Sequence, residues 1–283
     1  MNKIIRKKAL NATVTQMEIE APLIARKAKP GQFIILRVDS EGERIPLTVA
    51  GVNTGDETVK IIFQVVGATT EMLNHKNEGE YIADFAGPLG MPTHTEGIKK
   101  VCIIGGGVGC AIAMPVAQEF QRLGAEVTSI IGFRNKDLLI LEDEFNAFSN
   151  QLIVMTDDGS YGRKGNVTVP LKEMLESGKA FDMIITIGPL IMMKFVTMTA
   201  KPYGVPVTVS MNPIMIDGTG MCGGCRLTLH QGEKRITKFA CVDGPDFNGY
   251  EIDFDEAISR SRMYLDDEHH AYEETCHLFR EVP

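Results

Sequence analysis

Three cysteines and one aspartate near the end of the chain have the spacing of a metal centre. Four residues separate Asp217 from Cys222, two separate Cys222 from Cys225, and Cys241 follows sixteen positions after Cys225. In plant-type 2Fe–2S proteins, four residues separate the first cysteine ligand from the second, and two separate the second from the third. Asp217 therefore stands where such proteins have their first cysteine. The glycines between these residues let backbone N–H groups approach the sulfide ions. This loop therefore predicts a 2Fe–2S centre.

Other interpretations of the same residues stay open at this point. Zinc sites are also built from cysteines, although zinc loops often use two close pairs, and this loop has one pair and a distant single cysteine. Asp217 is either a ligand or a carboxylate that caps a turn, and Cys276 is an alternative fourth ligand. Cys102, in an apolar stretch, and Cys110, at an expected helix start, are predicted to be packing residues.

A glycine-rich turn begins the central part of the chain. Gly105, Gly106, Gly107 and Gly109 follow a short apolar strand and open an expected helix. A helix N-terminus offers free N–H groups and a positive dipole end to a phosphate, and glycine lets a pyrophosphate come close. This turn predicts a dinucleotide site, although tight strand–helix turns also use glycine.

Further polar and glycine residues follow the later predicted strands. Ligands of open parallel sheets bind at the carboxyl ends of the strands, and these candidates are Arg134, Asp157, Asp158, Gly159, Gly188 and Pro189. Arg134 is suited to a phosphate or a carboxylate, and it does not by itself indicate NADP. The segment 157–160 also has the composition of a surface turn.

Two short motifs in the first third of the chain suit phosphate binding. Residues 44–48 read RIPLT, and Gly67, Thr69 and Thr70 follow them. Arginine offers a planar fork to a phosphate, and threonine hydroxyls donate hydrogen bonds. On spacing alone the pattern also fits a solvated strand face.

The elements that must position these residues fall into four segments. Residues 1–97 contain short apolar stretches between turn residues, at 32–38, 59–66 and 81–85, with weak helical periodicity, which predicts an antiparallel β-barrel domain. Residues 98–210 alternate strands (101–104, 127–132, 151–155, 183–187, 205–210) with helices (111–123, 138–148, 169–177, 189–200), which predicts a parallel sheet covered on both faces. Residues 211–250 form the cluster-binding segment, expected to lack a conventional core, and 251–283 a polar helical tail.

Composition narrows the class of protein. The chain has 283 residues, a net charge of −8 and 44% hydrophobic residues, which fits a globular protein of about two domains and argues against a nucleic-acid binder. The apolar run 101–117 contains clustered glycines and a proline, so a strand, turn and helix start fit it better than a membrane span. No secretory signal is apparent, so a cytoplasmic location is expected.

Together, these motifs resemble those of the ferredoxin-reductase-like flavoprotein superfamily. Residues 44–48 look like its R-x-[YP]-[SLI]-[ST] flavin motif, and Gly67 with Thr69 and Thr70 look like its second, pyrophosphate-contacting motif. The resemblance implies FAD on a six-stranded Greek-key barrel and NAD(H) on the following domain. The flavin-binding residues that it implies are Arg44, Pro46, Leu47, Thr48, Gln64, Gly67, Thr69 and Thr70.

Within this superfamily, residues 138–144, 157–165, 210–225 and 239–247 are similar to the small subunits of NADH-dependent reduced ferredoxin:NADP oxidoreductase. The resemblance implies a heterodimer with a larger glutamate-synthase-like partner that holds FAD and 4Fe–4S clusters. Flavin-based electron bifurcation would occur in that partner, through which ferredoxin would react indirectly. That family has an aspartate in the cluster site, in agreement with Asp217. Ile187 departs from the cysteine that relatives often carry, which weakens any proposal for a thiol beside the nicotinamide.

These implications predict an electron-transfer subunit in which FAD lies between NAD(H) and the 2Fe–2S cluster, because FAD handles both hydride and single electrons. The tail 251–283 is the candidate docking element for the partner. Three alternatives remain: the related electron-transfer subunit of dihydroorotate dehydrogenase B, a stand-alone NADH:acceptor reductase, and a zinc- and nucleotide-binding regulatory module.

Overall fold

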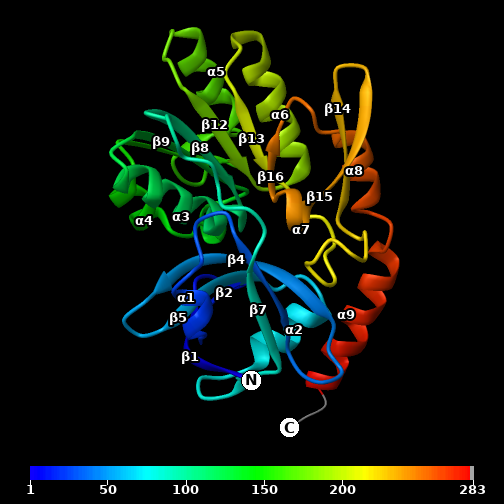
Figure 1. Ribbon diagram of the computed structural model, residues 1–283. Helices are drawn as coiled ribbons and strands as arrows, with labels where there is room; N and C mark the ends of the chain where they lie inside the picture. Colours follow the sequence, from blue (N-terminus) through cyan, green and yellow to red (C-terminus); the bar gives the residue numbers. More distant parts are fainter. Residues whose placement is uncertain (281–283) are drawn as a thin grey trace.

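The computed structural model describes the backbone of residues 1–280 and the side chains of residues 1–275. The described residues form two seven-stranded sheets, one after the other along the chain, and a small two-stranded sheet (Figure 1).

The first sheet is antiparallel and curls into a half-barrel. Its order is β6-β1-β2-β5-β4-β3-β7, and β2 lies beside β5 at the end of the β3–β4–β5 meander, which is a Greek-key arrangement. It has one strand more than expected, because Ala83 separates β6 from β7 and donates its N–H to Val38 O instead. The strands are β1 (Asn2–Ala9), β2 (Val14–Glu20), β3 (Phe33–Arg37), β4 (Arg44–Asn53), β5 (Thr58–Gln64), β6 (Tyr81–Ile82) and β7 (Asp84–Leu89).

Apolar residues at alternate positions of these strands fill the half-barrel. In a strand, residues two apart face the same side, and Met17 and Ile19 on β2 are buried together with Ile61 and Phe63 on β5. The weak helical periodicity of residues 1–97 did not indicate the two short helices of this part of the chain. The half-barrel also contains α1 (Pro22–Ala25) and α2 (Ala68–His75), which are too short for a clear helical period in the sequence.

The second sheet is parallel except for its last strand, with order β11-β10-β9-β8-β12-β13-β16. It comprises β8 (Lys100–Gly106), β9 (Glu126–Phe133), β10 (Gln151–Thr156), β11 (Arg163–Lys164), β12 (Met183–Ile187), β13 (Val207–Ser210) and β16 (Asp246–Asn248). The chain leaves β8 toward β9 and β10 on one side and later returns to β12 on the other. The carboxyl ends of β8 and β12 therefore flank the switch point at which open α/β sheets bind ligands.

Helices cover both faces of this sheet, as predicted (Figure 1). One face packs on α3 (Gly109–Arg122) and α4 (Glu142–Phe148), and the other on α5 (Thr168–Glu176) and α6 (Leu190–Ala200). The helix expected over 138–148 is shorter, because residues Lys136–Leu138 form a 3-10 turn and Leu141 has a positive φ of 61°. A second 3-10 turn, Lys201–Tyr203, ends α6.

The expectation that residues after Met211 lack a conventional core was wrong. The hairpin β14 (Arg226–Gln231) and β15 (Lys234–Phe239) buries Leu227 and Leu229. The short helix α7 (Ala240–Asp243) follows, and β16 then pairs antiparallel with β13. The segment therefore shares the core of the second sheet, although its three-residue strand has too little pattern to be predicted.

The tail is two helices rather than one. Helix α8 (Phe254–Arg260) packs on α6, and α9 (Leu265–Arg280) runs along α2 of the half-barrel (Figure 1). The side chain of Asp253 caps α8 by accepting a hydrogen bond from the N–H of Glu256. No helix in the described part of the chain is long and apolar enough to cross a membrane.

Candidate functional site

The glycine turn lies at the switch point of the second sheet. The N–H of Gly107 donates to the carbonyl of Gly132 (2.9 Å), which joins the turn to the end of β9. On its other side, a Cβ on Gly109 would lie 2.5 Å from Ile187 O and 2.8 Å from Gly188 Cα, at the end of β12. The turn and Gly188 are therefore brought together, as the sequence predicted.

The glycines of this turn have different roles. A Cβ on Gly106 would lie 2.4 Å from Met192 Sδ, and one on Gly105 would lie 2.9 Å from Cys110 Sγ. These glycines, like Gly109, are needed for close packing of the chain on itself. Gly107 differs, because its φ is +54° and a Cβ there would meet nothing within 4 Å. It is the glycine of the turn beside which a phosphate has room.

The ends of β9 and β10 also meet. The N–H of Asp158 donates to Arg134 O (3.3 Å), and the Arg134 side chain is exposed. Asp158 Oδ1 accepts hydrogen bonds from the hydroxyl (2.7 Å) and the N–H (2.9 Å) of Ser160, which hold the pKa of Asp158 below its usual range. The Asp158 carboxylate is thus used within its own turn, in line with the surface-turn alternative.

The first predicted flavin motif lies on β4. Pro46 pairs with Ile35 of β3. Strand β5 pairs with β4 only from Val49 onward, so the motif lies in the part of β4 that β5 does not cover. Arg44 Nη2 lies 3.9 Å from Asp84 Oδ2, and half of the Arg44 side chain is exposed. Because Asp84 is held more closely by Arg37, at 2.7 Å, the Arg44 guanidinium is available to a phosphate.

The second predicted flavin motif forms the start of α2. Thr70 Oγ1 accepts hydrogen bonds from the N–H groups of Val66 and Gly67, each at 3.0 Å. Gly67 has open space where a Cβ would lie. Thr69 Oγ1 donates to Glu43 Oε2 (3.3 Å), and Glu43 directly precedes Arg44. The two motifs are therefore neighbours in space; Glu43, which links them, was not singled out, although its position beside Arg44 was a usable signal.

The loop that contains Asp217, Cys222 and Cys225, here called the cluster loop, lies against the half-barrel beside the first flavin motif. Arg44 and Asp217 both line a hollow of ≈ 430 Å³, with Ile35 and Phe85 among its other walls. A Cβ on Gly218, whose φ is +75°, would lie 2.8 Å from Ile35 Cδ1. Glycine at this position thus lets the loop approach strand β3.

Two of the four predicted cluster ligands lie side by side. Cys225 Sγ and Cys241 Sγ are 3.2 Å apart and both residues are buried. Burial, followed by the neighbouring Cys225 thiol, raises the pKa of Cys241 to about 12. Cys222 is exposed on the same loop.

Asp217 is turned into the loop. Its Oδ1 accepts from the N–H of Thr219 (2.8 Å) and its Oδ2 from the N–H of Cys222 (3.1 Å). These bonds, that of Thr219 first, hold the pKa of Asp217 below its usual range, although burial opposes them. The Asp217 carboxylate is also close enough to Cys241 to help raise the pKa of that thiol.

This donor set fits a cationic centre. Thiolates are the form that binds metal, and two buried thiolates side by side are costly unless a positive centre compensates them. Among the described side chains, no three cysteine, histidine, aspartate or glutamate groups already form a complete metal-binding group. The side chain of Cys276, the alternative ligand, lies outside the described residues.

The other two cysteines are packing residues, as predicted. Cys102 and Cys110 have no exposed surface. Burial raises the pKa of Cys102 to about 12 and raises that of Cys110 further, so the helix start does not activate Cys110.

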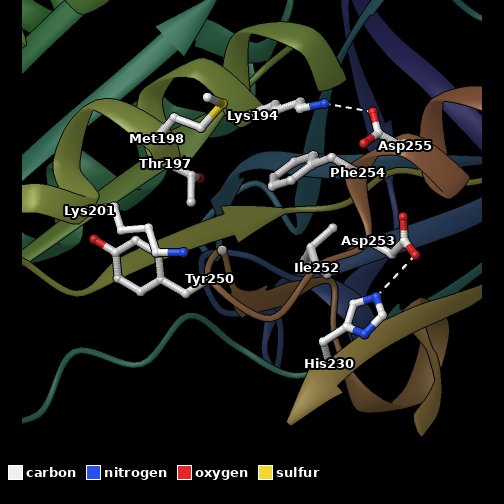
Figure 2. A pocket seen from close by; sticks show the side chains of 11 residues that line it. Lys194, Thr197, Met198, Lys201, His230, Tyr250, Ile252, Asp253, Phe254 and Asp255 are labelled. Carbon is white, nitrogen blue, oxygen red and sulfur yellow. Dashed lines mark hydrogen bonds and ion pairs between the residues drawn. The ribbon is translucent and has the colours of Figure 1, made fainter. Parts of the chain in front are cut away.

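A second hollow, of ≈ 410 Å³, lies between α6 and the segment that leads into α8 (Figure 2). Two ion pairs lie in its lining: Lys194 Nζ lies 2.6 Å from Asp255 Oδ1, and His230 Nε2 lies 3.1 Å from Asp253 Oδ2. None of the predicted site residues lines it, so it is separate from the sites above.

The two sheets together form the ferredoxin-reductase-like fold. A ferredoxin reductase of carbazole 1,9a-dioxygenase has the same fold at 16% identity, with a TM-score of 0.62 over 74% of this chain and 67% of that one. Residues 212–253 match the iron–sulfur cluster binding domain of dihydroorotate dehydrogenase B.

Closer relatives define the family. A Thermotoga maritima protein described as a homologue of the dihydroorotate dehydrogenase B (NAD(+)) electron transfer subunit is 45% identical, over 96% of this chain and 95% of its own. A chain in the structure of the NADH-dependent reduced ferredoxin–NADP oxidoreductase is 44% identical, with a TM-score of 0.89 and 97% of each chain covered. This chain belongs to the oxidoreductase family of dihydroorotate dehydrogenase B electron transfer subunits and their homologues.

Thr70→Ala is expected to lower both stability and FAD affinity. The substitution leaves the N–H groups of Val66 and Gly67 without their acceptor, and loss of such a cap costs about 1 kcal/mol. Urea unfolding and FAD fluorescence titration would measure the two effects. Thr70→Ser keeps the hydroxyl and should behave like the native chain; equal FAD affinity in all three would contradict a role for this turn in FAD binding.

Proposed function

We propose that this chain is an electron-transfer flavoprotein subunit that passes electrons between NAD(H), FAD and a 2Fe–2S cluster, to or from a larger ferredoxin:NADP oxidoreductase subunit. The observation that carries the proposal is that all three candidate sites border one strand, β4. Arg44 of β4 and Asp217 line one hollow, and α3, which begins at the glycine turn, packs on β4 farther along the strand, where Ala50 shares its apolar cluster.

The residues of each site have the chemistry that its cofactor needs. When bound, FAD would exchange two electrons with a nicotinamide and single electrons with a 2Fe–2S cluster. Arg44 and the N–H groups at the start of α2 would hold the flavin pyrophosphate. The backbone around Gly107 would hold the nucleotide, and Asp217, Cys222, Cys225 and Cys241 would hold the irons.

Exposed apolar side chains around the cluster loop support the proposal of a protein partner. Ile214, Ile216 and Val242 are exposed around Cys222, and 87% of Met221 is exposed. Exposed apolar side chains in one place favour a protein contact, and here they surround the residues from which electrons would leave. The chain in the NADH-dependent reduced ferredoxin–NADP oxidoreductase structure, with 97% coverage, supports a partner of that kind.

The electron-transfer subunit of dihydroorotate dehydrogenase B is the second candidate. The match of residues 212–253 and the Thermotoga maritima relative favour it. The two candidates share cofactors and differ in the partner, so copurification separates them. A copurifying subunit that oxidises dihydroorotate would replace the first proposal by the second.

The visible spectrum of the anaerobically purified chain, before and after NADH addition, tests the proposal. We expect flavin and iron–sulfur absorption, and we expect both to be bleached by NADH. A colourless preparation with stoichiometric zinc and no acid-labile sulfide would refute the proposal and support a regulatory module instead.

Asp217→Ala is expected to alter the cluster. Removal of a carboxylate ligand should shift the visible and EPR spectra and lower the iron content, because the site would keep only three thiolates. Asp243→Ala is a suitable control, since the Asp243 carboxylate accepts hydrogen bonds from Phe239 N–H and the Lys238 ammonium, and neither donor belongs to a predicted ligand. An EPR spectrum identical to that of the native chain would show that Asp217 is not a ligand of the cluster.

A further inference from the structure

A buried carboxyl group joins the linker between the two sheets to the edge of the second sheet. Asp246, the first residue of β16, is paired with Ser210 at the carboxyl end of β13. Thr93 lies in the linker between β7 and β8, and its Oγ1 donates to Asp246 Oδ2 at 2.6 Å. The Ser210 side chain also hydrogen-bonds the carboxyl group. Three separate parts of the chain therefore meet at one side chain.

The same linker is fastened to the half-barrel. The N–H of Thr93 donates to Pro30 O (2.9 Å), and a Cβ on Gly31 would lie only 2.3 Å from Thr93 Oγ1. Two residues earlier, the N–H of Met91 donates to Gly244 O (2.7 Å), at the end of the cluster segment. Thr93 and Asp246 thus connect the half-barrel, the second sheet and the exit of the cluster segment.

A carboxyl group is a costly choice for this position. Asp246 Oδ1 is buried and has no hydrogen-bond partner among the described residues. Within the described part of the chain, the side chains that hydrogen-bond the carboxyl are the two hydroxyls, and no lysine, arginine or histidine is paired with it. An unpaired buried polar atom destabilises the folded state, so packing alone does not account for aspartate here.

We propose that Asp246 is a positioning residue that sets the placement of the second sheet, and so of its glycine turn, against the flavin motif on β4. It holds the linker through Thr93 and the carboxyl end of β13 through Ser210. This inference rests on the proposed function, in which a nicotinamide at the sheet must meet a flavin on the half-barrel. A misplacement of about 1 Å in such a reaction costs on the order of 100-fold in rate.

Stopped-flow reduction of the bound flavin by NADH, with the holoprotein under anaerobic conditions, tests the proposal. We expect Asp246→Ala and Thr93→Val to slow flavin reduction by about 10- to 100-fold and to change the dissociation constant of NADH by less than about twofold, since neither lines the glycine turn. Asp246→Asn, which keeps an acceptor for Thr93, should restore most of the rate. Thr186→Val is the matched control, because Thr186 Oγ1 in β12 is also buried without a hydrogen-bond partner in the part of the chain that the structure describes.

Trypsin cleavage after Lys99 gives a readout that does not depend on activity. Lys99 is exposed at the end of the linker, but its N–H and carbonyl are bonded to Asp182 and Glu126. Cleavage therefore needs this end of the linker to open, and looser linker contacts in Asp246→Ala and Thr93→Val should speed it. Burial raises the pKa of Asp246, so its stabilising protonated form is lost as the pH rises through that raised pKa. Cleavage of the native chain, relative to Asp246→Asn at each pH, should therefore increase with pH.

The outcomes separate the two proposals. Native rates of flavin reduction and of cleavage in both Asp246→Ala and Thr93→Val would overturn the positioning role. If NADH fails to reduce the flavin of the native chain, the proposed function fails, and the cleavage experiment still decides whether Asp246 holds the linker. If Asp246→Ala does not fold, Thr93→Val alone decides.

Discussion

Replacement of Cys225 by serine is expected to remove the iron–sulfur centre and to leave the rest of the chain folded. Cys225 is 1% exposed and its Sγ lies 3.2 Å from Cys241 Sγ. The surrounding core therefore leaves no space for another side chain or a water molecule to take the place of its thiol. Substitutions outside the ligand shell already lower metal affinity by about 10- to 100-fold, and loss of a thiolate ligand should exceed that. Iron and acid-labile sulfide per chain, with the EPR spectrum, measure the effect.

The control for this variant is Cys102→Ser, the same change at a buried cysteine of strand β8. It should lower the free energy of unfolding by about 1–3 kcal/mol, because it buries a hydroxyl in an apolar core, and it should keep its iron. Flavin reduction by NADH should persist in Cys225→Ser, since the predicted nucleotide and flavin residues are unchanged. Full iron and sulfide content in Cys225→Ser would show that the centre does not use this thiol.

Replacement of Gly109 by alanine is expected to disrupt the nucleotide end of the second sheet. The new Cβ would lie 2.5 Å from Ile187 O and 2.8 Å from Gly188 Cα, and both are backbone atoms that cannot move independently of β12. Overpacking of this kind costs about 1–3 kcal/mol. Because the displaced residues are those beside which NADH is proposed to bind, its affinity should fall by about tenfold or more, the equivalent of about 1.4 kcal/mol.

Urea unfolding and NADH titration would measure these two changes. Gly51→Ala is the control, because a Cβ there would meet Lys60 Cβ at an ordinary 3.8 Å. It should leave NADH affinity unchanged. A Gly109→Ala chain with native stability and native NADH affinity would mean that β12 can shift without cost, contrary to the packing described above.

The sequence predicted the elements with a strong local pattern. The alternation of apolar strands and amphipathic helices placed β12 at its observed bounds, 183–187, and the glycine turn at the start of α3. The flavin motifs were singled out by their resemblance to a known superfamily, because arginine and threonine on a strand also fit a solvated face, and the cysteine loop by its ligand spacing. Their convergence around Arg44 and Asp217 could not be predicted, because it depends on how the cluster loop folds back on the half-barrel.

Contacts between distant residues left no local signal. Thr93 and Asp246 are separated by 153 positions, and neither belongs to a motif. Strand β16 has three residues, which is too few for a strand period. The split of the tail into α8 and α9 was also missed, because polar helical composition continues through the turn between them.

The pairing of β13 with β16 has a consequence for how this architecture could arise. The cluster segment leaves the second sheet after Ser210 and returns at Asp246, which is the pairing partner of Ser210. An insertion whose two ends are already adjacent adds little closure entropy to the host fold. A reductase lacking the iron centre could therefore acquire this segment, or lose it, as one evolutionary unit while keeping its flavin and nucleotide machinery.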